Sequence, residues 1–251
     1  MNSFESGFVE DLRFGFVQSA IPSARVANPS LITNEDNDTM LRAIREELKR
    51  SKRFTFSVAF ISPDAIAMLK QVFLDSKIPG TIITSDYLGF NSPAAFRELA
   101  NLSRHTEIEV RVFRKARSGF HAKGYLFQGA DSETAIIGSS NLTPSALLHN
   151  KEWNLRFSAM PHGDIVQQIR SAVEHQIEHS VPLTDQWITS YEVTYVPRIP
   201  APTPGSSVLP PEAAPVSRID EAFEAALASN ELVPSFDSIR PQDTALVLAV
   251  R

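Results

Sequence analysis

A histidine and a lysine separated by one residue stand in the segment Phe120–Phe127, whose apolar residues alternate as in a strand. Residues two apart on a strand face the same side, so we expect His121 and Lys123 to project together. An imidazole could attack a phosphorus atom or protonate a leaving oxygen, and an ammonium could neutralise a non-bridging oxygen. The pair therefore predicts chemistry on a phosphoryl group.

A second polar group follows where the next expected strand, 134–137, runs into a Gly-Ser-Ser-Asn turn. The turn places Ser139 and Asn141 just before a helix capped by Thr143, whose free N–H groups could hold phosphate oxygens. Glu152 comes eleven residues after Asn141. Its carboxylate could fix the tautomer of a histidine and support the charged imidazole.

Charge is distributed unevenly along the chain. The 251 residues include 24 basic and 29 acidic side chains, and the formal net charge is −5. Residues 103–125, however, hold six Lys or Arg against two Glu, a local net charge of +4. Arg114, Lys115 and Arg117 directly precede the histidine, and this position favours contact with the DNA backbone over a merely solvated loop.

Composition excludes several other classes of protein. The absence of cysteine excludes disulfides, thiolate metal sites and cysteine nucleophiles. No apolar run approaches the roughly 20 residues that a membrane helix needs. The N-terminus has no basic region followed by an apolar stretch, the pattern of a secretory signal. We therefore expect a soluble cytoplasmic protein with no membrane partner.

Periodicity of the apolar residues predicts the elements that must position these groups. Strand-like and helix-like segments alternate, which is typical of an α/β layered domain. The alternating Phe54, Phe56 and Phe60 are expected to pack in its core. The expected helices are 40–48, 63–76, 93–101, 143–148 and 165–179, and the expected strands are 53–60, 81–85, 108–112, 120–127, 134–137 and 153–159.

Four parts of the chain are expected. An N-terminal arm, 1–38, precedes the main domain, 39–195. A proline-rich linker follows over 196–217, because seven of residues 197–217 are proline. The last part, 218–251, contains an alanine-rich helical segment too short for a core of its own. It is expected to dock on a partner or to continue into a longer protein.

H-x-K followed by G-S-x-N resembles the phospholipase D superfamily. The positions that match the family's nucleophile, phosphate-binding lysine, turn serine, amide and supporting acid are His121, Lys123, Ser139, Asn141 and Glu152. The family usually has Asp seven residues after the histidine, and Gln128 stands there in this chain. This departure argues against the lipase branch and is tolerated in nuclease branches with one motif per chain.

Three segments look like one group within that superfamily: 84–91, 120–125 and 138–142. The group is the nuclease-like domain at the N-terminus of bacterial DEAD/DEAH-box helicases and in ATP-dependent restriction enzymes. The resemblance implies a layered domain with a mixed β-sheet flanked by helices. It also implies a helicase or ATPase motor, which must be a partner or a fused segment because the chain contains no G-x-x-x-x-G-K-[ST].

The resemblance further implies a mechanism that needs no metal ion or cofactor. Superfamily members place two copies of the motif around one phosphate: one histidine forms a phosphohistidine, and the other protonates the leaving alcohol and then activates water. With one copy per chain, we expect a homodimer in which two His121 side chains meet across a twofold axis. The resulting hypothesis is a metal-independent endonuclease that cleaves DNA within a helicase-linked restriction or defence system.

Several alternatives remain open. Gln128 and the overall acidity also suit a catalytically weak or inactive module that binds DNA or a partner in a helicase assembly. Hydrolysis of phospholipid head groups is disfavoured because nothing amphipathic suggests membrane contact. A second H-x-K at residues 149–151 has no G-S-x-N after it and is interpreted as a loop. The H-x-x-E-H at residues 175–179 matches a zinc-protease pattern, but no third ligand is evident, which favours an ordinary helix face.

Overall fold

The protein is described by a computed structural model over residues 3–24, 26–114 and 119–196. Lys115, Arg117, nearly all of the expected linker and the whole expected C-terminal segment lie outside the described residues. The helices are α1 (Ser3–Phe16), α2 (Met40–Arg50), α3 (Pro63–Ser76), α4 (Pro93–His105), α5 (Pro144–Leu148), α6 (Asp164–Glu178) and α7 (Asp185–Thr194). The strands are β1 (Ser30–Ile32), β2 (Arg53–Val58), β3 (Gly80–Ser85), β4 (Ile108–Phe113), β5 (Lys123–Gln128), β6 (Glu133–Gly138), β7 (Asn154–Ala159) and β8 (Ser180–Pro182).

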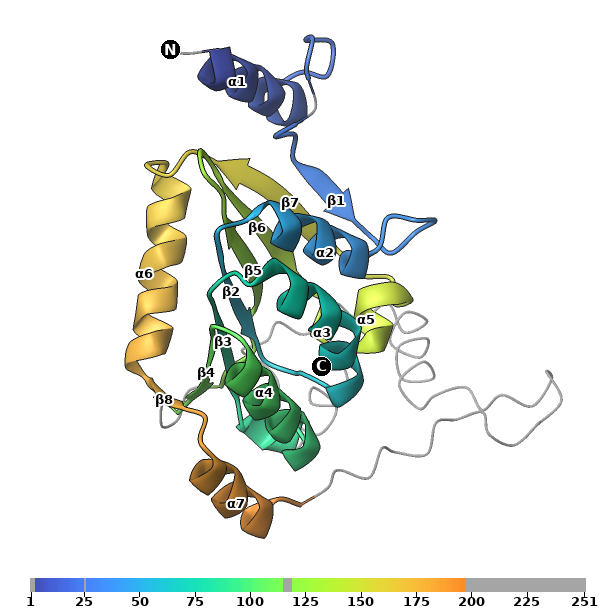
Figure 1. The fold of residues 1–251 in the computed structure, drawn as a ribbon. Coiled ribbons are helices and arrows are strands. Elements are labelled where there is room, and N and C mark those ends of the chain that lie inside the picture. Colours follow the sequence, from blue (N-terminus) through green and yellow to red (C-terminus); the bar gives the residue numbers. More distant parts are fainter. Residues whose placement is uncertain (1–2, 25, 115–118, 197–251) are drawn as a thin grey trace, which may run out of the picture. The chain divides into compact units, whose positions relative to one another are not determined.

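These strands form one mixed sheet within the described residues, in the order β1-β7-β6-β5-β2-β3-β4-β8. The neighbours β2, β3 and β4 are parallel, and the other pairs are antiparallel. Helices α2 to α5 cover one face of the sheet, and α6 lies on the other (Figure 1). The expected α/β fold with a mixed sheet flanked by helices is therefore confirmed.

Side chains that alternate along β2 build both layers. Phe54 and Phe56 are fully buried under the α2–α5 layer, together with Tyr125 and Phe127 of the neighbouring β5. Ser57 faces the other way, and its hydroxyl donates to Gln176 of α6. The expectation of core packing holds for Phe54 and Phe56. Phe60 lies beyond the end of β2 and is half-buried. It packs against a small buried cluster of Ala59, Ile83, Phe113 and Phe120 and also contacts His121.

Three helices begin as the Ser-Pro and Thr-Pro pairs predict. The hydroxyls of Ser62, Ser92 and Thr143 each accept a hydrogen bond from the backbone N–H three residues later. Proline follows each cap at the first helical position, where its missing N–H costs nothing. These caps fix the starts of α3, α4 and α5.

Several elements differ from the expectations. The strand expected over 120–127 begins only at Lys123, and α4 continues to His105 instead of ending near residue 101. The sequence arguments also missed β1, β8 and α7. Within the segment expected as an N-terminal arm, α1 is a helix of 14 residues, and β1 pairs with β7 as an edge strand of the sheet.

Candidate functional site

The predicted phosphate-binding groups gather at one end of the sheet. In the antiparallel pairs, the start of β5 lies beside the ends of β2 and β6, because Lys123 pairs with Val58, and Gly124 with Ile137. The start of β7 joins them, because Gly138 pairs with Asn154. The loops at this end carry His121, the Gly-Ser-Ser-Asn turn and Glu152.

His121 and Lys123 lie together, although His121 precedes the strand. The lysine Nζ is 3.0 Å from His121 Nδ1 and 3.3 Å from Nε2, and it donates to the His121 carbonyl oxygen at 3.1 Å. The two side chains therefore lie together as expected, but the alternation of side chains along a strand is not the cause. A long, flexible side chain at the first position of β5 reaches back to the exposed imidazole.

Electrostatics at the pair favour a neutral imidazole. Partial burial lowers the pKa of His121 below its ordinary value, and the nearby Lys123 charge lowers it further. Burial also lowers the pKa of Lys123, while the Glu152 carboxylate works in the opposite direction. A neutral imidazole has a lone pair available for nucleophilic attack, and an ammonium beside it can receive an anion.

The Gly-Ser-Ser-Asn turn is held tightly against the start of β7. A Cβ on Gly138 would lie 2.1 Å from the backbone oxygen of Trp153, so only glycine allows this close approach. The Ser139 N–H donates to that same oxygen at 3.1 Å, and the Trp153 N–H donates to the Ser139 hydroxyl at 3.0 Å. Ser140 is buried, and its backbone N–H donates to Asn154 Oδ1 at 3.1 Å.

One side-chain atom of Asn141, Oδ1, is buried without a hydrogen-bond partner among the described residues. Buried side-chain polar atoms almost always find a partner, so an orphan at this position indicates a group that the protein receives. A half-turn of the amide exchanges its O and N atoms and would place N–H donors there, suited to a phosphate oxygen.

Glu152 is placed differently from the expectation that it orients His121. Its Oε2 accepts a hydrogen bond from the Ser139 hydroxyl, and its Oε1 accepts one from Asn150 Nδ2 at 3.4 Å. Within one chain, the described contacts of His121 are with Lys123 and the ring of Phe60. Glu152 therefore braces the turn and balances the charge of Lys123.

The sequence arguments gave no role to the loop that follows β2, which also borders the site. The backbone oxygen of Phe60 accepts from the Leu142 N–H, and the Ser62 N–H donates to the Leu142 oxygen, both at 3.0 Å. The Phe60 ring centroid is 5.3 Å from that of His121. The available signal was the end of a buried strand directly before a capped helix, a common place for binding loops.

Among the predicted DNA-binding residues, the structure describes Arg114 alone. Its side chain is exposed and lines an open groove with Asp86, Trp187 and Tyr191. Its backbone N–H donates to the oxygen of His179 at 2.8 Å, which fixes the end of β4 against the residue after α6. Arg114 thus lies at the same end of the sheet as the predicted phosphate site.

The departure at Gln128 lies far from this site. Gln128 is the last residue of β5, and its backbone oxygen accepts from the Lys52 N–H at 2.8 Å. It lies five positions along the strand from Lys123, a distance of about 17 Å. The missing aspartate therefore leaves the groups around His121 unchanged.

The two other motifs do not assemble into sites. In the second H-x-K, Lys151 pairs with Glu35 at 2.8 Å, and both side chains are exposed. His175 of α6 and His179, directly after that helix, have ring centroids 4.4 Å apart. In the described part of the chain, no three His, Asp or Glu side chains are grouped closely enough to hold a metal ion.

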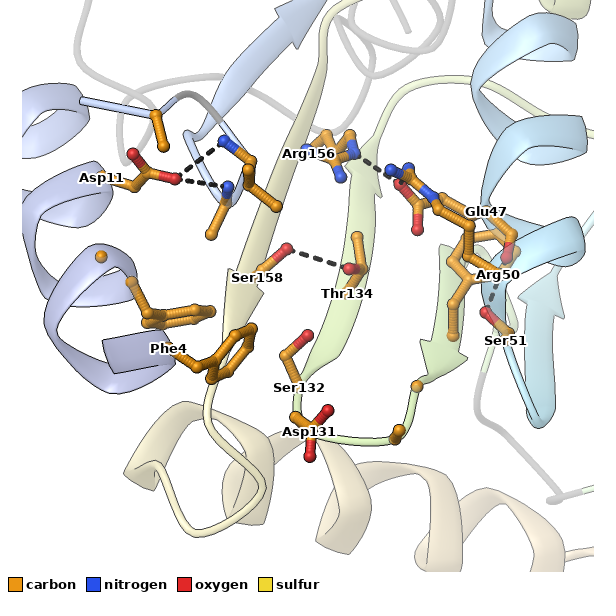
Figure 2. Close-up of a pocket in the computed structure, with 18 of the residues that line it drawn as sticks. Phe4, Asp11, Glu47, Arg50, Ser51, Asp131, Ser132, Thr134, Arg156 and Ser158 are labelled. Carbon is orange, nitrogen blue, oxygen red and sulfur yellow. Dashed lines mark hydrogen bonds and ion pairs between the residues drawn. The ribbon is translucent and has the colours of Figure 1, made fainter. Parts of the chain in front are cut away.

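A cavity of about 360 Å³ lies near the opposite end of the sheet, between α1, α2 and the β5–β6 loop (Figure 2). Its wall includes the buried Glu47, which accepts from Arg156 at 2.7 Å and from Arg50. Thr134 and Ser158 share a hydrogen bond at 2.9 Å on the same wall. Because Glu47 pairs with Arg156 and Thr134 with Ser158, and because no lining residue is a predicted site residue, the cavity gives no support for the phosphate chemistry.

Two solved structures are similar to this chain at low sequence identity. NucT from Helicobacter pylori is 16% identical, covers 62% of this chain and 98% of its own, and has a TM-score of 0.48. Nuc from Salmonella typhimurium, a phospholipase D family member, is 18% identical over 62% of this chain and 98% of its own, with a TM-score of 0.47. No curated protein matches the sequence.

The sequence itself matches a family model over most of the described domain. The model is described as "Cardiolipin synthase, PLD-like domain", and it matches residues 23–177. That range contains β1 to β7 and all five predicted site residues, from His121 to Glu152. The chain therefore belongs to the phospholipase-D-like family.

Proposed function

We propose that this chain is a metal-independent phosphodiesterase that cleaves DNA with His121 as its nucleophile. The observation that supports the proposal is the meeting of three groups at one end of the sheet. They are an imidazole whose pKa is lowered, an ammonium 3.0 Å from it, and an amide whose buried oxygen has no partner in the described residues. Together they suit an anionic, tetrahedral group such as a phosphodiester.

In the proposed first step, the imidazole nitrogen of His121 attacks the phosphorus atom. The bond from phosphorus to the leaving oxygen breaks, and that oxygen takes a proton from a second imidazolium. In the next step this second imidazole removes a proton from water, and the hydroxide displaces phosphorus from His121. Lys123 and Asn141 would hold the non-bridging oxygens, and Glu152 would keep the turn in place through Ser139.

The mechanism requires a second histidine, which we assign to a second copy of the chain. An apolar patch beside the site offers a surface for that copy. Leu31, Ile137 and Leu155 pair across β1, β7 and β6 and face the same side of the sheet, and all three are exposed. Trp153, two residues before Leu155, is 73% exposed and follows directly after Glu152. An exposed apolar patch next to a reactive site is typical of an interaction surface.

The homodimer can be tested by the mass in solution. We expect wild-type protein to elute at the mass of a dimer in light-scattering chromatography, and Trp153→Glu to elute as a monomer with little cleavage activity. Val193→Glu provides a matched control, because Val193 is an equally exposed apolar residue on α7. An active wild-type monomer would contradict the assignment of the second histidine.

The activity itself can be tested by nicking of supercoiled plasmid DNA in EDTA. We expect wild-type protein to nick the plasmid and His121→Ala to be inactive. His162→Ala is a suitable control, since His162 is exposed in the turn between β7 and α6 at the other end of the sheet. Activity that disappears with EDTA, or survives in His121→Ala, would refute the mechanism.

A phospholipid substrate is the main competing proposal, because the same chemistry could act on a lipid phosphodiester. No helix in the described ranges is long and apolar enough to cross a membrane. Release of head groups from phosphatidylglycerol vesicles, with no cleavage of DNA, would favour the lipid over DNA. Release of neither product would favour the non-catalytic binding module.

We further place this activity in a helicase-linked restriction or defence system in the cytoplasm, as the resemblance of segments 84–91, 120–125 and 138–142 implies. A motor domain would supply ATP-driven translocation, and the present chain would supply cleavage. Purified protein is then expected to nick DNA at the same rate with and without ATP. Stimulation by ATP would become visible only when the motor is added.

A further inference from the structure

Two aromatic rings continue outward from the predicted nucleophile, and a third, Tyr87, lies beside Gly119, two residues before His121. The ring of Phe60 meets that of His121 edge-on, with centroids 5.3 Å apart, and Lys123 Nζ is 5.7 Å from the Phe60 ring centre. Phe90 follows, with its ring centroid 4.2 Å from that of Phe60. Tyr87 lies one turn earlier in the same segment. We call Phe60, Phe90 and Tyr87 the aromatic ledge.

The outer side chains of the ledge are partly exposed to solvent. Phe90 is 43% exposed and Tyr87 is 38% exposed, and Leu88 between them is 52% exposed. Single exposed apolar side chains are ordinary, but three within four residues beside a phosphate site form a surface that suits a ligand with a flat apolar face. A nucleobase is such a ligand, and in DNA its phosphate is joined to it through one deoxyribose.

The ledge is held rigidly by a buried asparagine. Asn91 Oδ1 accepts from the Ile61 N–H at 2.7 Å, and its Nδ2 donates to the backbone oxygens of Ala59 and Ser85 at 2.8 and 2.7 Å. The side chain thus ties the loop that carries Phe60 to the segment that carries Phe90. A ligand that stacks here meets a preformed surface and loses little free energy in ordering it.

Backbone conformation at the ledge supports a functional role. Leu88 has a φ of 54°, in the left-handed region that residues other than glycine and asparagine seldom adopt. Tyr87 packs against Gly119, where an added Cβ would lie 3.2 Å from the tyrosine ring and hydroxyl. Strained residues held by their surroundings gather at ligand sites, because the fold alone gives no reason to keep them.

Paired bases cannot use such a ledge. In a duplex, each base is already stacked on both faces and hydrogen-bonded to its partner, so its face is free only after unpairing. Unpaired bases stack on protein aromatic rings in single-strand binding proteins with little regard to sequence. The exposed basic side chain of Arg114 at the same end of the sheet can accompany the strand's backbone.

We propose that the aromatic ledge stacks the unpaired bases next to the scissile phosphate, so that the protein selects single-stranded over double-stranded DNA. This inference rests on the proposed function, because it names the substrate of the same site. Phe90 and Tyr87 are its specificity-determining residues. Phe60 positions Phe90 beside His121, and Asn91 ties the loop of Phe60 to the segment that carries Phe90.

The test compares one fluorescein-labelled 20-nucleotide DNA strand with the same strand annealed to its complement. Binding is measured by fluorescence polarisation and cleavage by gel, both in EDTA. We expect wild-type protein to bind and cleave the single strand at least 10-fold better. Phe90→Ala should weaken single-strand binding by between about 5- and 150-fold, the range for loss of one base–aromatic stack, and should change duplex binding less than 2-fold.

Two further variants separate stacking from folding. Phe90→Tyr keeps a flat ring and should restore single-strand binding to within 3-fold of wild type. Phe16→Ala removes another exposed phenylalanine, from α1, and should have no effect. In a series of strands that each carry one abasic site at a different position, one strand should bind wild-type protein more weakly than the others. Phe90→Ala should be insensitive to that same abasic site, since the two partners of one stack couple energetically.

The outcomes distinguish this inference from the proposed function. Equal binding of single-stranded and duplex DNA, or a Phe90→Ala variant that loses both in parallel, would overturn the ledge while cleavage still stands. Phe90-dependent binding of the single strand without any cleavage would support the ledge and refute the nuclease. Failure of Phe90→Tyr to restore single-strand binding would also overturn the stacking role of the ledge.

Discussion

Removal of the Asn91 side chain should destabilise the protein and disorder the loop beside the site. Asn91 is almost fully buried, and its amide makes four hydrogen bonds, to Ile61, Ala59, Thr84 and Ser85. In Asn91→Ala, the oxygen of Ala59 keeps a bond from the Thr84 hydroxyl at 3.2 Å, whereas the Ile61 N–H loses the acceptor described for it. The four contacts therefore do not contribute equally.

The magnitude follows from this difference. One orphaned buried donor costs about 1–3 kcal/mol, and each replaceable hydrogen bond contributes about 1 kcal/mol. We expect Asn91→Ala to lower the free energy of unfolding by about 2–4 kcal/mol. Asn91→Asp should cost more, although it preserves the shape, because a buried carboxylate would face the two backbone oxygens that now accept from Nδ2.

The assay is urea denaturation followed by circular dichroism, in which the midpoint should fall while the slope stays constant. Asn101→Ala on α4 is the control, and it should stay within about 0.5 kcal/mol of wild type. Cleavage of single-stranded DNA should also fall in Asn91→Ala, because Phe60 loses its support. A variant as stable as wild type, or Asn91→Asp more stable than Asn91→Ala, would refute this account of the loop.

Three further predictions concern the turn, the imidazole and a buried ion pair. Gly138→Ala should lower the free energy of unfolding by about 1–3 kcal/mol in urea melts, because its Cβ would lie 2.1 Å from a backbone oxygen beside β7. Burial and the Lys123 charge lower the pKa of His121, so its NMR titration midpoint should lie below 6.5, and neutral imidazole and cleavage should be lost as the pH falls through that midpoint. Lys123→Gln should raise the midpoint; an unchanged or lower midpoint would contradict the assigned cause. Glu47→Ala should cost about 3–5 kcal/mol in thermal or urea unfolding, because it leaves the largely buried Arg156 unpaired, and a cost below 1 kcal/mol would show that water compensates the arginine.

Much of the fold could be predicted because local signals agreed with the final packing. The alternation of Phe54 and Phe56 with small residues matches a strand covered on both sides, and Ser62 and Ser92 with their following prolines mark helix starts. The edge strands β1 and β8 have three residues each, too few for a period-two pattern. Their pairing depends on neighbours that are distant in sequence, and the local signals for α7 are a cap at Thr184 and an acidic residue, Asp185, in the first turn.

The composition of the site was more predictable than its geometry. Spacing predicted that His121, Lys123 and Asn141 belong to one phosphate site, and the structure places all three at the same end of the sheet. The turn needs glycine at position 138 for a reason that sequence alone does not reveal. The contact between Glu152 and Ser139 depends on the register of β6 and β7. The position of Phe60 depends on hydrogen bonds from Asn91, which is distant in sequence. Such bonds leave no periodic pattern in the sequence.

The most direct test of the central claim is the detection of a covalent phosphohistidine. Wild-type protein mixed with labelled single-stranded DNA in EDTA and quenched in alkali should carry the label. Mass spectrometry should place the adduct on the peptide that contains His121, and mild acid should remove it. The adduct should be absent in His121→Ala and present in His162→Ala. Cleavage of DNA without any adduct on His121, or with an adduct elsewhere, would contradict the proposal that this histidine is the nucleophile.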